Sequence, residues 1–136
     1  DVANINIQKH HLNGRVHAIQ SDLWTELDTQ QYDIIVSNPP YVGADEMATL
    51  PKEYRHEPAS ALEADDNGLA LVEKIITGAS KHLTAQGLLF VEVGNSDFAV
   101  MKKWPKTPFM WLEFEHGGHG VFMLTYKQCL DFLTDY

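Results

Sequence analysis

The chain has 136 residues, of which 44% are hydrophobic and 21% are charged, as in an ordinary soluble globular domain. Its net charge of −9 comes from 19 acidic and 10 basic residues. The basic residues form no cluster of the kind that replaces the counterions of nucleic-acid phosphates. An acidic surface suits a basic protein partner, or is simply a solvated surface. No apolar run approaches transmembrane length, and a single cysteine, Cys129, excludes an internal disulfide and fits a reducing cytoplasm.

The beginning of the chain is predicted to form the remainder of a helix and then a short strand. Residues 2–12 place apolar side chains among polar ones in a helical pattern, and Asn13-Gly14 is a typical helix end. Residues 15–20 are predicted as a strand, and Asp22-Leu23-Trp24 lies at its carboxyl end. A second strand is predicted over residues 31–37. Its β-branched run, Ile34-Ile35-Val36, is typical of a parallel strand that is buried on both faces.

The rest of the chain begins with an irregular stretch, residues 42–66, of a length that is usually functional or mobile. The elements predicted after it are a helix over 69–83, a strand over 88–93, a helix over 97–104 capped by Asn95 or Ser96, strands over 109–115 and 120–126, and a final helix over 128–136. His116-Gly117-Gly118-His119 joins the last two strands and predicts a hairpin turn rather than a metal site. This order predicts an α/β sheet that is mostly parallel, with ligands bound beyond the carboxyl ends of its strands.

Asn38-Pro39-Pro40-Tyr41 directly follows the strand predicted over residues 31–37. Two prolines can simply end a strand, but that interpretation leaves Asn38 and Tyr41 unexplained. A planar amide or aromatic amino nitrogen is a poor nucleophile because its lone pair is delocalised. The Asn38 side-chain oxygen and the Pro39 carbonyl can accept its two N–H bonds, which strengthen as the nitrogen becomes positive. Tyr41 can stack on the planar group. The tetrad therefore predicts methyl transfer to such a nitrogen, with Asn38, Pro39 and Tyr41 as catalytic residues.

The tetrad, together with residues 50–58, resembles the HemK-type protein glutamine methyltransferases. Within that family the chain is most similar to the branch that acts on a large-subunit ribosomal protein. The similarity extends to Ser21-Asp22-Leu23, to residues 66–69 and 92–96, and to residues 111–114 and 118–122. The tetrad alone is shared with DNA adenine and ribosomal RNA guanine methyltransferases. Residues 53–58 are a much narrower signature and favour the protein-modifying branch.

The resemblance implies a role for individual residues. Asn38, Pro39, Pro40 and Tyr41 would form the substrate pocket, with Asn38 also beside the cofactor, S-adenosylmethionine. Asp22 would bind the adenine amino group and Leu23 would pack on the base. An Asp at that position can equally be a helix cap or turn former. No metal is implied. The implied partner is a basic ribosomal protein of the large subunit, with neither a membrane nor direct nucleic-acid contact.

Several features of the family have no counterpart in this sequence. There is no Gly-rich cofactor loop, no acidic residue placed to hold the ribose, and no N-terminal helical domain. We therefore expect a single partial catalytic domain, residues 1–136, which is the C-terminal portion of a Rossmann-like class I methyltransferase with its first two strands missing. These strands would lie between the strands predicted over 15–20 and 31–37. Their absence would leave an exposed apolar edge that favours self-association.

Three functions remain open from the sequence. The first is methylation of a glutamine side-chain amide on a ribosomal protein by the catalytic domain of which this chain is a fragment. The second is methylation of an adenine or guanine amino group in nucleic acid, which the acidic charge disfavours. The third is an inactive fragment that cannot bind the cofactor.

Overall fold

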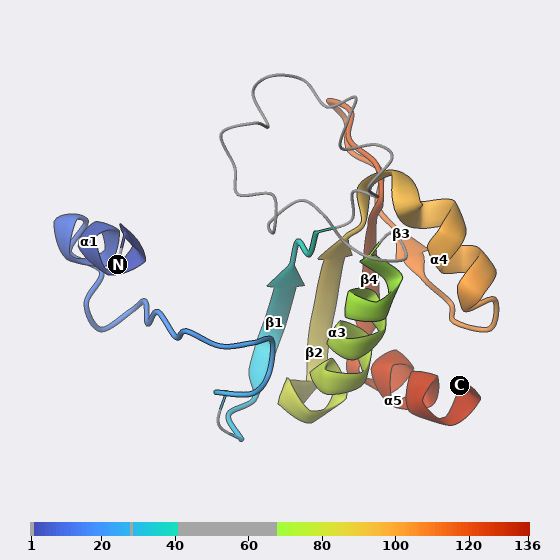
Figure 1. Ribbon diagram of the computed structural model, residues 1–136, viewed down its shortest axis with the longest axis horizontal. Helices are drawn as coiled ribbons and strands as arrows, with labels where there is room; N and C mark the ends of the chain where they lie inside the picture. Colours follow the sequence, from blue (N-terminus) through green and yellow to red (C-terminus); the bar gives the residue numbers. More distant parts are fainter. Residues whose placement is uncertain (1, 28, 41–67) are drawn as a thin grey trace. The chain divides into compact units, whose positions relative to one another are not determined.

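The computed structural model describes residues 2–27, 29–40 and 68–136, and divides the chain into two compact units, Asp1–Gln30 and Gln31–Tyr136. The second unit holds a four-stranded sheet with the strand order β1-β2-β4-β3 (Figure 1). β1 (Tyr32–Ser37) and β2 (Leu83–Glu92) are parallel. β4 (Val121–Thr125) is antiparallel to β2 and to β3 (Met110–Trp111). The predicted α/β class and its terminal antiparallel hairpin are confirmed. The described sheet has one parallel and two antiparallel pairs.

In the first unit, the predicted helix is present as α1 (Val2–Lys9) and buries none of its residues. It ends in a Schellman motif, in which Leu12 N–H donates to the Ile7 carbonyl and His11 N–H donates to the Gln8 carbonyl. His11, with a φ of 54°, takes the left-handed position that the sequence assigned to Gly14.

The strand predicted over residues 15–20 is wrong. Arg15 lies in a turn, and residues 16–20 belong to no helix or strand. Val16 and Ile19 are 43% and 54% exposed. Extended backbone becomes a strand only when a neighbour satisfies its N–H and C=O groups, and none of the described strands pairs with this segment.

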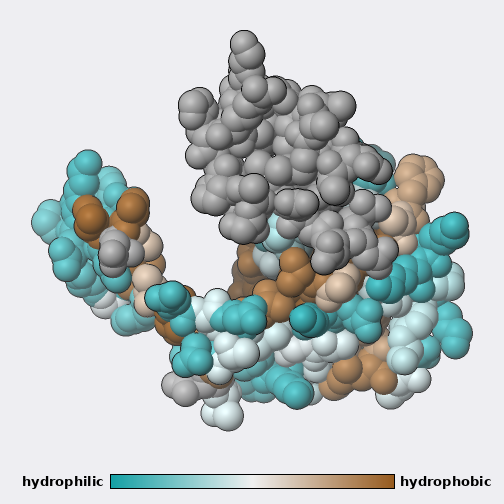
Figure 2. Space-filling view, viewed as in Figure 1, coloured by the Kyte–Doolittle hydropathy of each residue, from teal (hydrophilic) through white to brown (hydrophobic). Residues whose placement is uncertain are grey.

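α3 (Leu69–His82) has the hydrophobic face that its spacing predicts. Its buried apolar residues are Leu69, Val72, Ile75, Ile76 and Ala79. α3 and α5 (Tyr126–Asp135) pack on each other, and both contact β2 (Figure 1). α5 buries Cys129 and Phe132, whereas Leu130 and Leu133 are exposed, and Figure 2 shows hydrophobic atoms over this helix. The core therefore lies between these two helices and one face of the sheet.

The prediction that the Ile34-Ile35-Val36 strand is buried on both faces is also wrong. Ile34 and Val36 are 61% and 74% exposed, whereas Ile35 is half-buried. Side chains alternate between the two faces of a strand, so Ile34 and Val36 share the face opposite to Ile35. Ile35 pairs with Leu89, which is fully buried. β1 also stands at the end of the described strand order, so among the described strands only one of its edges is paired.

β2 begins five residues before the strand predicted over 88–93, because α3 passes into it without a break. The register with β1 jumps from Tyr32↔Leu83 to Ile34↔Leu88. Gly87 lies in this irregularity, where a Cβ would come within 3.0 Å of the Tyr32 carbonyl oxygen and 2.9 Å of a Leu83 methyl group. Gln86-Gly87 is predicted from the sequence to break the helix that precedes it. Gly87 instead permits a close backbone approach to Tyr32.

After β2 come a 3₁₀ turn, η4 (Gly94–Ser96), and α4 (Asp97–Lys103), which confirms the predicted shorter helix. Ser96 occupies the predicted N-cap position, but its side chain makes no capping hydrogen bond. Asp97 Oδ1 accepts the Phe98 N–H at 2.8 Å instead.

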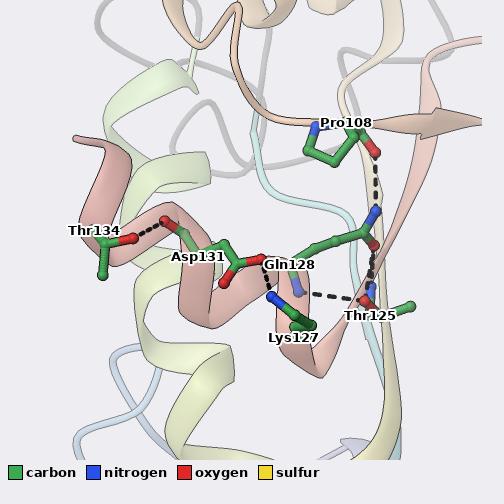
Figure 3. Close-up of polar contacts among 6 residues, drawn as sticks. All are labelled: Pro108, Thr125, Lys127, Gln128, Asp131 and Thr134. Atoms are coloured by element: carbon green, nitrogen blue, oxygen red, sulfur yellow. Dashed lines mark hydrogen bonds and ion pairs between the residues drawn. The ribbon is translucent and has the colours of Figure 1, made fainter.

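α5 is held at both of its ends, and Figure 3 shows the contacts at its N-terminal end. Thr125 and Gln128 form a capping box, and Gln128 Nε2 also donates to the Pro108 carbonyl at 3.2 Å. At the other end, the Tyr136 hydroxyl accepts the Lys106 N–H at 2.7 Å. These contacts tie the loop before β3 to α5. The helix predicted over residues 128–136 is confirmed as α5.

Candidate functional site

Asn38, Pro39 and Pro40 directly follow Ser37, the last residue of β1. Asn38 is exposed, Pro39 is buried and Pro40 is half-buried. The structure thus places Asn38-Pro39-Pro40 at the carboxyl end of a parallel strand, where the sequence predicted them. Tyr41 lies outside the described residues, as do residues 42–66 and 50–58, so the predictions made for them remain predictions.

The carboxyl end of β2 lies beside that of β1, because the two strands are parallel and Ser37 pairs with Val91. On the other side of β2, Glu92 pairs with Val121 at the start of β4. Beyond this pair, Val93 N–H donates to the Gly120 carbonyl at 2.7 Å. Three segments therefore meet at one edge of the sheet: the residues after β1, the residues after β2, and the residues that precede β4.

Gly120 approaches η4 more closely than any other residue type could. It has a φ of +74°, and a Cβ built on it would lie 2.0 Å from the Gly94 carbonyl oxygen. Gly94 itself has a φ of 50°. Only glycine combines this left-handed backbone with so short a distance. The sequence assigned Gly117 and Gly118 to the turn and Gly120 to the strand after it, and did not predict this close approach.

One side-chain contact joins the hairpin to η4. His119 Nε2 and Asn95 Oδ1 lie 2.8 Å apart, and both residues are exposed. The imidazole N–H donates to the amide oxygen. The sequence predicted His119 in a turn and Asn95 as a candidate helix cap and missed this pairing, because a contact across 24 positions leaves no local signal.

The predicted hairpin is present, but β3 ends at Trp111, so its loop spans residues 112–120 and is longer than the turn predicted over 116–119. Within the loop the Gly117 N–H donates to the Phe114 carbonyl, and Gly117 and Gly118 have positive φ angles. Among the described residues, no three His, Cys, Asp or Glu side chains are grouped as a metal site would require. Within the same part of the chain, no helix has the length and apolar character needed to cross a membrane.

Asp22 and Leu23 lie in a turn of the first unit. The sequence had left open that Asp22 forms a turn instead of binding adenine. The Asp22 carbonyl accepts both the N–H and the hydroxyl of Thr25, at 3.2 and 3.0 Å. Leu23 has a φ of 51°, and Ser21 Oγ accepts the Glu26 N–H at 3.0 Å. The Asp22 backbone is thus a turn former, while its side chain is exposed along an open hollow that Ser21, Thr25 and Glu26 also line. An exposed carboxylate beside a half-buried Leu23 fits the adenine end of a nucleoside cofactor.

Comparisons with known proteins agree with this fold. Residues 1–67 match the family described as "Methyltransferase small domain". This match and the mixed α/β sheet agree with the predicted Rossmann-like methyltransferase fold.

Two relatives narrow that class further. The chain is 52% identical over 131 residues to the ribosomal protein uL3 glutamine methyltransferase of Francisella tularensis subsp. tularensis. It is 42% identical over 130 residues to the protein of the same name from Neisseria gonorrhoeae. Both matches cover 96% of this chain, but only 42% and 43% of the relatives, so the chain spans less than half of their length. The predicted relationship to glutamine methyltransferases of ribosomal proteins is confirmed.

Proposed function

We propose that the protein transfers a methyl group from S-adenosylmethionine to the side-chain amide nitrogen of a glutamine in a basic ribosomal protein of the large subunit. The observation that carries the proposal is the position of Asn38-Pro39 at the carboxyl end of β1, beside the carboxyl end of β2. The names of the two relatives support a ribosomal protein, with uL3 as the first substrate to test. This chain contributes the part of the domain that orients the substrate.

The proposed chemistry follows from the exposure of Asn38 and the burial of Pro39. A buried Pro39, with its φ fixed by the ring, holds the backbone in one conformation, while the exposed Asn38 side chain can reach a substrate. The Asn38 Oδ1 and the Pro39 carbonyl accept the two N–H bonds of the glutamine amide. These bonds strengthen as the nitrogen attacks and becomes positive, so they stabilise the transition state more than the bound substrate. Tyr41 would stack on the amide plane, and the product loses its extra proton to water.

S-adenosylmethionine supplies an electrophilic methyl group when it is bound. Among the described residues, the exposed Asp22 carboxylate would accept the adenine amino group, and the half-buried Leu23 would pack on the base. No Gly-rich loop for the methionine portion occurs in this sequence. We therefore expect this chain alone to bind the cofactor much more weakly than the full-length protein does. Isothermal titration calorimetry of both with S-adenosylmethionine tests this, and equal affinities would contradict it.

Replacement of Asn38 by Ala in the full-length protein tests the catalytic role. Loss of one transition-state acceptor is expected to lower kcat by about 10²- to 10³-fold, with the thermal unfolding midpoint nearly unchanged because Asn38 is exposed. Gln86→Ala is the matched control, since Gln86 is an exposed amide near the opposite end of β2. Radiolabelled methyl transfer to uL3 gives the rates. Near-normal activity of the Asn38 variant would show that the amide-acceptor mechanism is wrong.

Methylation of a nucleic-acid amino group is the second candidate, because the tetrad alone does not exclude it. The net charge of −9 makes it the weaker one, since phosphate binding requires a basic surface. Incubation of the full-length enzyme with uL3, ribosomal RNA and DNA under the same conditions separates the two candidates. We also place the protein in the cytoplasm, which the single cysteine supports.

We further propose that the isolated 136-residue chain associates with itself through the edge of β1. Ile34 and Val36 are exposed there, and β1 ends the order of the described strands. An apolar edge of this kind pairs readily with a second chain. Light scattering at working concentration is expected to show species larger than a monomer, and a monodisperse monomer would count against the proposal.

A further inference from the structure

We propose that the hairpin loop, residues 112–120, binds the protein substrate and presents Glu113 and Glu115 to basic residues beside the target glutamine. The contact between His119 and Asn95, called the clip below, holds this loop in place. His119 and Asn95 are positioning residues in this scheme, and the two glutamates determine specificity. The inference rests on the proposed function, because it concerns the same edge of the sheet. It adds a second region that recognises the protein substrate.

The strand register places the loop close to Asn38. Ser37 of β1 pairs with Val91, and Val121 of β4 pairs with Glu92, so β2 alone separates Asn38 from the residues that precede Val121. Two strand spacings of about 4.8 Å put the Asn38 and Gly120 backbones about 10 Å apart. An extended peptide covers that distance in about three residues. A glutamine held at Asn38 therefore brings its sequence neighbours within reach of the loop.

The loop requires a clip because its own backbone does not determine its direction. Gly117 and Gly118 have φ angles of 88° and 105°, and turns made by glycines have many accessible conformations. Two contacts restrain it at its carboxyl end. The first is the 2.7 Å hydrogen bond from Val93 N–H to the Gly120 carbonyl. The second is the 2.8 Å contact between His119 and Asn95, which links the hairpin to η4.

The chemistry of the loop fits a basic substrate. Glu113 and Glu115 are both exposed and lie two positions apart, with the exposed Phe114 between them. They stand at the edge of the sheet where the target amide is held. Ribosomal proteins of the large subunit carry many lysine and arginine residues, so two carboxylates here would attract the segment around the target glutamine and exclude acidic segments.

The test measures steady-state methylation of uL3 by the full-length enzyme carrying Glu113→Gln and Glu115→Gln. Removal of the two exposed charges is expected to raise KM for uL3 about 5- to 10-fold, with kcat and the KM for S-adenosylmethionine unchanged. Raising the salt to about 0.5 M is expected to bring the wild-type KM close to that of the variant, because salt screens exposed charges. Since neither substitution touches the core, the unfolding midpoint reports that the variant is folded.

The clip is tested with His119→Leu, which is expected to raise KM for uL3 about 3- to 5-fold. His119→Gln restores a side-chain N–H that can donate to Asn95, and is expected to recover most of the loss. His10→Leu is the control, an exposed histidine outside this loop, and is expected to leave KM unchanged.

The proposal is overturned if the double glutamine variant keeps its KM within twofold, or if kcat falls while KM is constant. An equal effect of His10→Leu and His119→Leu would also overturn it. These outcomes differ from failure of the proposed function, because in each of them Asn38→Ala still lowers kcat for uL3 by about 10²- to 10³-fold.

Discussion

Replacement of Gly120 by Ala tests how the hairpin is joined to the carboxyl end of β2. The new Cβ would lie 2.0 Å from the Gly94 oxygen, and real Cβ atoms essentially never come closer than 3.0 Å, so the backbone must shift by about 1 Å. A shift of that size along the Val93–Gly120 hydrogen bond stretches its 2.7 Å length beyond bonding distance, at a cost of about 1 kcal/mol. The positive φ of 74° adds about 1–2 kcal/mol for a residue with a side chain. The total is about 2–3 kcal/mol.

Urea unfolding of the full-length protein measures this loss, and the midpoint of thermal unfolding is expected to fall by about 10 °C. Gly117→Ala is the matched control, because Gly117 has a φ of 88° but a Cβ there meets nothing within 4 Å. The control should lose only the backbone term of about 1–2 kcal/mol. Equal losses for the two variants would refute the conclusion that the close approach to Gly94 matters, since the conformational cost alone would then explain both.

Two further predictions concern the core. Ile76 in α3 is fully buried, so Ile76→Ala should lower the free energy of unfolding in urea by about 2–5 kcal/mol. Ile34 is 61% exposed, so Ile34→Ala should lower it by less than about 1 kcal/mol. Similar losses for the two variants would contradict the assignment of the core. Burial raises the pKa of the Cys129 thiol to about 12, so the native protein should resist a disulfide-exchange reagent at pH 8 and react only on unfolding. Because the folded pKa lies above the ordinary value of 9.0, this group favours folding fully below pH 9, and that contribution is lost as the pH rises towards 12.

Elements with a strong local pattern could be predicted from the sequence. The spacing of Leu69, Val72 and Ile76 predicts α3 because a helix brings these positions to one face, whatever that face packs against. The β-branched run of β1 and the position of Asn38 after it were predictable for the same reason, since strand and breaker are adjacent in the chain.

Features that depend on a neighbour could not be predicted in this way. Residues 15–20 have the composition of a strand, but pair with no described strand. Ile34 and Val36 have the apolar character of buried residues, yet their face of the sheet is exposed. Gly87 reads as a helix end, although it serves a close approach to the Tyr32 carbonyl. In each case the outcome depends on a second segment, which local sequence does not specify.

Two contacts hold the hairpin loop. One is expected to stabilise the fold, and the other is expected to affect only substrate binding. The Gly120 contact is made by backbone atoms, and Gly120 is buried, so its loss should lower stability and displace the loop together. The contact between His119 and Asn95 is made by exposed side chains, whose hydrogen bond contributes little to stability. His119→Leu should therefore raise KM for uL3 while the unfolding midpoint stays constant, whereas Gly120→Ala should change both. If His119→Leu lowered stability as much as Gly120→Ala, the contact would be part of the fold, and its effect on KM would carry no information on substrate recognition.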